Sequence, residues 1–149
     1  MARTDRLRNM LYVSAFSLLL MTTVVSAQEQ APAKPPPAAA AAQAENWQLP
    51  VGCGFRFQDT FDNRHPLYAG DVGIGINPKL AARVREADLI IALGVRLGEM
   101  TTGGYTLLDV PRPKQKLVHV HAGPEELGRV YAADLLLQAS MACAAKALE

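Results

Sequence analysis

The chain has 149 residues, enough for one domain of ordinary size. Its formal net charge is +1 at pH 7, and its Lys and Arg residues are scattered, which argues against the basic face or stripe of a nucleic-acid-binding protein. The two cysteines, Cys53 and Cys143, are too few for a disulfide-rich scaffold and lack metal-ligand spacing, so we predict two buried free thiols.

The first 27 residues have the order of a secretory signal. Three arginines within the first eight residues precede an apolar run that ends in Val25, Ser26 and Ala27, a small-residue cleavage site. We therefore predict that residues 1–27 direct export to the periplasm or the medium and that the mature chain begins at Gln28. The apolar run is short of the roughly 20 residues that span a membrane comfortably, and an uncleaved membrane anchor is the alternative. A mitochondrial transit peptide ranks third, because its arginines would be spread along an amphipathic helix.

Residues 28–45 are rich in proline and alanine. Three consecutive prolines favour an extended conformation, and the alanine run has too little apolar bulk to form a core. This segment is predicted to be a tether. The folded part is expected to start near Asn46 and to cover residues 46–149.

The first folded segment predicts a strand followed by a polar turn. The strand extends from Gln48 to Phe57, and a proline and two glycines interrupt it, as at a strand end that leads into a loop. His65 follows, directly before a proline. It is either a catalytic acid or base or a turn residue with extended geometry, and the second interpretation is favoured because no carboxylate stands at an interpretable spacing.

A glycine-rich turn and a helix come next. Gly70, Gly73 and Gly75 allow positive φ angles, but their spacing departs from a dinucleotide-binding fingerprint. Asn77 and Pro78 are typical of a helix start, with Asn as the cap and Pro at the first helical position. The apolar residues of the helix share one face: Leu80, Val84 and Ala87.

A buried strand follows this helix. Residues 89–93, LIIAL, are apolar without polar alternation, which is typical of a parallel strand covered on both faces, and Gly94 ends the strand. A helix that leads to such a strand, with a glycine-containing loop after it, is the repeating unit of an open α/β sheet. Ligands bind beyond the strand ends of such sheets, so residues 94–105 are the predicted site.

This loop contains groups that suit a phosphate. Arg96 can form bidentate bonds to a phosphate, and the hydroxyls of Thr101 and Thr102, with the amide of Gly94, can complete an anion cradle. Gly73 of the preceding turn joins this candidate set. The arrangement suits a nucleotide diphosphate. A solvated loop with an ordinary surface arginine is an equally open alternative.

The last third predicts a strand over residues 117–121, a short helix from Gly123, a strand in ADLLLQAS, and a C-terminal helix capped by Ser140. His119 and His121 lie on the same side of the first of these strands. They would share a metal only with a third or fourth ligand, and none is nearby in the sequence. Separate, non-metal roles are therefore favoured.

Three segments together resemble a known family. HPLYAGDVGIG, EADLIIALGVRLGEMTTGGYT and KLVHVHAGPEELGRVYAADLLLQAS are similar, in order and spacing, to the central domain of thiamine diphosphate-dependent enzymes of the acetolactate synthase type. The resemblance covers residues 46–149. It implies an α/β, Rossmann-like parallel sheet of six strands flanked by helices. In some members this domain binds FAD or another nucleotide, and in others it only holds the assembly together.

The chain departs from the family in three ways. Thiamine diphosphate and Mg²⁺ are held by two other domains of the family, which supply a catalytic glutamate and a GDG…N motif, and no GDG occurs here. The signal and tether stand where the family has its first strand and helix, so the sheet is expected to lack both. His121 and Ala122 replace acidic residues that are frequent in flavin-binding members, which argues against hydrogen bonds to ribose hydroxyls.

The resemblance therefore implies part of an enzyme that acts on 2-oxo acids with thiamine diphosphate and Mg²⁺, and that is not catalytic alone. The missing domains would come from another chain, or the chain would self-associate. Two alternatives stay open: an exported module that binds FAD or ADP or serves in assembly, and a truncated gene product without an independent role. Export itself stands against the resemblance, because the family is cytoplasmic.

Overall fold

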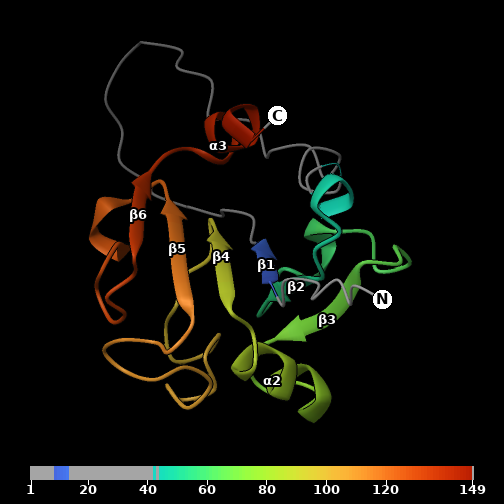
Figure 1. The fold of residues 1–149 in the computed structure, drawn as a ribbon, viewed down its shortest axis with the longest axis horizontal. Helices are drawn as coiled ribbons and strands as arrows, with labels where there is room; N and C mark the ends of the chain where they lie inside the picture. Colours follow the sequence, from blue (N-terminus) through green and yellow to red (C-terminus); the bar gives the residue numbers. More distant parts are fainter. Residues whose placement is uncertain (1–8, 14–41, 43, 149) are drawn as a thin grey trace, which may run out of the picture.

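The structure is a computed structural model that describes residues 9–13, 42 and 44–148. Its centre is one sheet of six parallel strands in the order β3-β2-β1-β4-β5-β6 (Figure 1). The strands are β1 (Asn9–Val13), β2 (Val51–Gly54), β3 (Tyr68–Val72), β4 (Leu89–Leu93), β5 (Lys116–His121) and β6 (Leu135–Gln138). The predicted α/β, Rossmann-like parallel sheet is confirmed.

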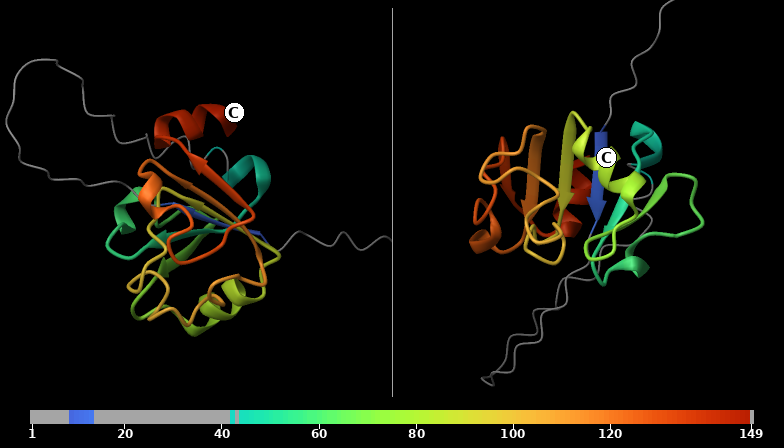
Figure 2. Two further views of the ribbon diagram at one scale, coloured as in Figure 1. Left: turned by 90° about the vertical axis from the view of Figure 1, so that its left-hand side faces the viewer. Right: turned by 90° about the horizontal axis from the view of Figure 1, so that it is seen from below.

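Helices cover both faces of this sheet. Helix α2 (Pro78–Arg85) and helix α3 (Met141–Leu148) lie on opposite sides of it, as the edge-on view in Figure 2 shows. Two 3-10 turns, η1 (Gln58–Thr60) and η2 (Pro124–Glu126), lie in the connections, and residues 44–47 are helical. Among the described residues, no helix is long and apolar enough to cross a membrane.

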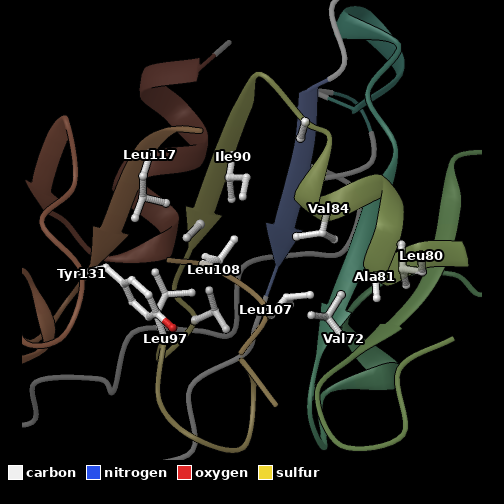
Figure 3. Packing of buried hydrophobic residues seen from close by; sticks show 13 residues of the cluster. Val72, Leu80, Ala81, Val84, Ile90, Leu97, Leu107, Leu108, Leu117 and Tyr131 are labelled. Atoms are coloured by element: carbon white, nitrogen blue, oxygen red, sulfur yellow. The ribbon is translucent and has the colours of Figure 1, made fainter. Parts of the chain in front are cut away.

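The core forms two clusters, one on each face of the sheet. The α2 side holds Val72 of β3, Ile90 of β4 and Leu117 of β5, each fully buried (Figure 3). The α3 side holds Val51 and Cys53 of β2 together with residues of β4, β5 and α3. Each cluster thus spans strands on both sides of the sheet centre.

Helix α2 forms as the sequence predicts. The side chain of Asn77 accepts a hydrogen bond from the Lys79 amide at 2.9 Å, which caps the first turn. The predicted apolar face is buried, with Val84 fully covered and turned toward the sheet (Figure 3). At the other end, Nε2 of the buried Gln115 donates to the carbonyls of Val84 and Arg85, so a distant side chain satisfies the helix end.

The region before α2 differs from the prediction. Strand β2 has only four residues, because Gln48 and Arg56 on either side of it adopt left-handed φ angles of 52° and 68° and end the extended run. Strand β3 lies where a glycine turn was predicted. Gly70, at φ 119°, and a register shift between Val51 and Gly52 allow this segment to pair with β2.

The strands that follow α2 agree with the prediction. β4 pairs with neighbours on both sides, and Gly94 ends it with φ 64° while its amide donates to the Val120 carbonyl at 2.8 Å. The predicted cap of α3 is also present, because the Ser140 hydroxyl accepts a hydrogen bond from the Cys143 amide. The fold therefore presents the predicted loop at the carboxyl end of a central strand.

The centre of the sheet differs from the prediction, because the position expected to lack a strand is occupied. β1, from the segment predicted to be a secretory signal, lies between β2 and β4, with Asn9 opposite Leu89 and Val13 opposite Leu93. The rest of the predicted signal and most of the tether lie outside the described residues. Ala44, at the end of the predicted tether, is fully buried, so the packed core begins slightly before Asn46.

Candidate functional site

The strand order defines where a ligand would bind. In a sheet of order 3-2-1-4-5-6 the direction of strand succession reverses between β1 and β4, and ligands bind outside the carboxyl ends of the strands at that point. The loop that starts at Gly94 leaves β4 there. The residues that follow Val13 lie outside the described part of the chain, so the structure shows this site from the β4 and β5 side.

Gly73 reaches this loop. A Cβ atom added to Gly73 would lie 2.8 Å from the Phe55 Cβ and 2.9 Å from the Met100 carbonyl oxygen. The turn after β3 therefore packs directly on the loop that was predicted to bind a ligand. The structure brings Gly73 to the same end of the sheet as Arg96 but shows no contact between them.

The two threonines of the predicted cradle are turned inward. Thr101 and Thr102 are 8% and 1% exposed. The hydroxyl of Thr102 donates to the Gly98 carbonyl at 2.9 Å, and its amide donates to the same oxygen at 3.0 Å. In this conformation the Thr102 hydroxyl stabilises the loop and does not present itself to a ligand.

Arg96 is held at the surface by a carboxylate that the sequence analysis did not select. Its Nε atom lies 3.5 Å from Oε1 of Glu126, and Nη1 of Arg129 donates to that same oxygen at 2.7 Å. The side chain of Glu126 is 5% exposed, whereas those of Arg96 and Arg129 are 60% and 61% exposed. One buried carboxylate thus orients two exposed guanidinium groups, and the three charges sum to +1. We call Arg96, Glu126 and Arg129 the arginine pair site.

Of the two contacts in the arginine pair site, only the one between Glu126 and Arg129 could be inferred from the sequence. Glu126 and Arg129 are three residues apart at η2, a spacing at which a carboxylate and a guanidinium can meet. For this segment the sequence predicts only a short helix from Gly123. Arg96 is thirty positions earlier, and only the folded sheet brings it to Glu126.

The two histidines of β5 are buried and contact backbone groups inside the fold. Nε2 of His119 donates to the Val95 carbonyl at 2.9 Å, and burial is the main cause that lowers the pKa of His119 below 6.5. Nδ1 of His121 lies 3.0 Å from both the amide nitrogen and the carbonyl oxygen of Gly123. Their ring centroids are 6.1 Å apart, and within the described residues no three His, Cys, Asp or Glu side chains form a metal-binding group.

The hollow beside the arginine pair site is small. Leu97, His119, Glu126 and Tyr131 contribute to the lining of a cavity of about 10 Å³, which has room for one water molecule. A shallow depression of about 420 Å³, lined by residues 85–88 and Lys114, lies at the amino end of β4, away from the switch point. A diphosphate can therefore reach the guanidinium groups, while the described residues around Glu126 leave a cavity for one water molecule and none for an adenine or flavin ring.

His65 has a carboxylate partner that the sequence did not reveal. Its Nδ1 accepts a hydrogen bond from the Leu67 amide, so Nε2 carries the proton and donates to Glu45 at 2.8 Å. The ring also packs edge-on against Phe61. Both nitrogens are engaged, and His65 links the helical residues 44–47 to the loop before β3. The sequence favours the structural interpretation because no carboxylate partner is evident in it, and that reason is wrong, since Glu45 is such a partner.

The cysteines are free, as predicted. Cys53 is buried and accepts a hydrogen bond from the Thr60 hydroxyl, and burial is the main cause that raises the pKa of its thiol. Cys143 is exposed on α3, so the prediction of a buried thiol is wrong for this residue. The two cysteines therefore do not form a disulfide in this structure.

A parallel sheet with this strand order, and with helices on both faces, defines an α/β, Rossmann-like domain. Residues 34–148 match the protein-family model described as "Thiamine pyrophosphate enzyme, central domain". The match covers more than half of the chain, and the chain belongs to this family.

Curated relatives include enzymes of two names. The chain is 35% identical over 86 residues to a sulfoacetaldehyde acetyltransferase of Roseovarius nubinhibens, a match that covers 57% of this chain and 14% of the relative. It is 34% identical over 92 residues to the acetolactate synthase large subunit of Parasynechococcus marenigrum, covering 62% of this chain and 14% of the relative. A probable acetolactate synthase large subunit of Methanocaldococcus jannaschii is 30% identical over 92 residues, covering 62% of this chain and 15% of the relative. The chain therefore corresponds to about a seventh of these relatives.

Proposed function

We propose that this chain is a nucleotide-holding and assembly domain that works with thiamine diphosphate- and Mg²⁺-binding domains on a partner chain, in an enzyme that acts on 2-oxo acids. Family membership and the names of the relatives support the class of enzyme. The observation that carries the nucleotide-holding part is the arginine pair site, where a buried carboxylate directs two guanidinium groups outward in the connections that follow β4 and β5.

The chemistry of this site suits the diphosphate of FAD or ADP. Guanidinium groups form charge-assisted, bidentate hydrogen bonds with phosphate oxygens, and Arg96 and Arg129 are both accessible. The adenosine or flavin part has less support, because the adjoining cavity is about 10 Å³ and the buried His121 stands where flavin-binding members often have an acid. The expected affinity for nucleotides is therefore low and comes mainly from the phosphate contacts.

Calorimetry with ADP and FAD tests the nucleotide part of the proposal. A hydrogen bond to a charged group contributes about 1.5–3 kcal/mol, and each 1.4 kcal/mol is tenfold in the dissociation constant, so Arg96→Ala should weaken ADP binding at least about tenfold. Arg83→Ala is the matched control, because Arg83 is an exposed arginine on α2. Undiminished ADP or FAD binding by Arg96→Ala would show that the nucleotide lies elsewhere.

The catalytic part is tested separately. Thiamine diphosphate and Mg²⁺ should bind the chain alone only weakly, and the chain alone should not turn over pyruvate. Tight, magnesium-dependent binding of thiamine diphosphate in calorimetry would contradict the assignment of that cofactor to partner domains. Reconstitution of turnover by partner chains that carry both the glutamate-bearing domain and the GDG…N domain would support it.

The last strand supports the assembly role. The leucine side chains of β6 remain 47%, 42% and 43% exposed at positions 135, 136 and 137. Among the described strands, β6 pairs with β5 alone and so forms one edge of the sheet. Exposed apolar edges are the surfaces that other chains pair with, whether a second copy or a partner domain.

A further inference from the structure

The centre of the sheet is filled by sequence that the family does not account for. The family match begins at residue 34, whereas β1 ends at Val13. β1 is nevertheless the strand that joins β2 to β4, with Leu11 opposite both Val51 and Ile91. A segment outside the family match therefore completes the family's sheet.

The two halves of the sheet depend on this strand. Neighbouring strands lie about 4.8 Å apart, so β2 and β4 stand two inter-strand spacings apart, roughly 10 Å, with β1 between them. Without β1, the sheet would divide into a β3-β2 pair and a β4-β5-β6 group. The inner backbone groups of β2 and β4 would lose their hydrogen-bond partners, which is costly inside a core.

The packing on both faces of the sheet depends on this distance between β2 and β4. On the α2 side, the core cluster unites Val72 of β3 with Ile90 of β4. On the α3 side, it unites Val51 of β2 with Leu93 of β4. These residues belong to opposite halves of the sheet, so the clusters are continuous only while a strand holds the halves at this distance.

The connection is long enough for this topology. Parallel neighbouring strands need a crossover of a dozen or more residues, and the 37 residues 14–50 connect β1 to β2. The segment also has suitable residues for a strand, since NMLYV combines apolar and aromatic side chains. The same composition is what makes the segment resemble the start of a signal's apolar run.

We propose that the gap between β2 and β4 is a strand-binding site whose occupant is residues 9–13, and that the folded protein therefore keeps its N-terminal segment. Cleavage after Ala27 would remove β1 and leave this site open. In one molecule, export with cleavage and the six-stranded fold exclude each other. This inference does not rest on the nucleotide-holding function.

A nicked form of the full chain tests the proposal. A protease site is inserted between Ala33 and Lys34, and the purified protein is cleaved there and applied to a size-exclusion column in native buffer. The N-terminal fragment should stay in the peak of the folded domain, because the parallel ladder with β2 and β4 holds it. Loss of the fragment from a domain that stays folded and monodisperse would overturn the proposal.

Two variants make the test specific. Tyr12→Pro removes a backbone donor from the middle of a central strand and should release the fragment from the peak. Gln30→Pro adds a proline to the proline-rich tether and should leave the fragment bound. Equal retention in both variants would overturn the assignment of residues 9–13 to the ladder.

Hydrogen exchange and mass spectrometry of the unmodified chain apply even where Tyr12→Pro does not fold. The amides of residues 9–13 should exchange as slowly as those of β4, whereas exchange at the rate of an unstructured peptide would overturn the proposal. The folded protein recovered from cells should retain Met1 or Ala2. A folded, monodisperse protein that begins at Gln28 would overturn the proposal and support the predicted cleavage.

Discussion

Arg96 and Arg129 share one oxygen of the buried Glu126 carboxylate, at 3.5 Å and 2.7 Å. This arrangement fixes both guanidinium groups, and it also partly neutralises them before any anion arrives. Glu126 therefore both positions the arginine pair site and competes with a ligand for it.

Replacement of Glu126 by Gln should separate these two effects. Loss of hydrogen bonds to a charged group should lower the free energy of unfolding by about 1–3 kcal/mol, while release of the arginines should strengthen the binding of ADP or pyrophosphate. Denaturant unfolding and calorimetry measure the two quantities. The neighbouring Glu125→Gln, at an exposed position, should change neither. Weaker ADP binding by Glu126→Gln would contradict this expectation and show that the positioning of the two arginines outweighs the competition for them.

Stability should depend on pH through His119. Because burial lowers the pKa of the folded-state imidazole below 6.5, the folded protein binds fewer protons than the unfolded chain in that range. Stability from the neutral ring is complete above pH 6.5 and is lost as the pH falls toward the folded-state pKa, with a slope of at most about 1.4 kcal/mol per pH unit.

Urea unfolding between pH 5 and 7.5 measures this dependence. His119→Gln keeps an amide that can donate to the Val95 carbonyl but cannot titrate, so its stability should vary less with pH. Identical slopes for wild type and variant would assign the pH dependence to other groups.

The contact between Gly73 and the loop should be sensitive to one methyl group. Gly73→Ala places a Cβ 2.8 Å from the Phe55 Cβ, and the φ of 141° disfavours any side chain, so we expect a loss of about 1–3 kcal/mol in stability. Gly98→Ala, in the same loop, meets open space and should change stability by less than about 1 kcal/mol. Thermal unfolding compares the two, and equal effects would contradict the packing of Gly73 on this loop.

The β6 edge should mediate self-association. The Asp134 amide donates to the Leu117 carbonyl of β5, so by the alternation of a strand Leu135 and Leu137 direct their backbone groups to the open side. Sedimentation velocity over a concentration series should show association by the wild type, and Leu137→Lys should reduce it. Ile74→Lys, at an exposed apolar residue outside the strand, is the control. A wild-type monomer at all concentrations would contradict the prediction.

Local patterns were enough to predict several elements. The Asn77 and Pro78 start of α2, its buried face, the strand LIIAL and the turn at Gly94 each depend on residues within a few positions of one another. Cap hydrogen bonds, helical periodicity and apolar runs are short-range properties, so they are readable without the fold. Strand β3 was missed because its glycines suggested a turn, and only the shifted register with β2 made it a strand.

The sequence by itself determined the class of domain, the position of the candidate loop and the exposed charge of Arg96. The tertiary structure decided which residues that loop would meet. Glu126 joins arginines thirty and three positions away, and Glu45 meets His65 across twenty positions. Asn9–Val13 became a central strand although its composition is equally that of a signal. Partner choice across such separations depends on how the whole sheet closes, and no local pattern contains that information.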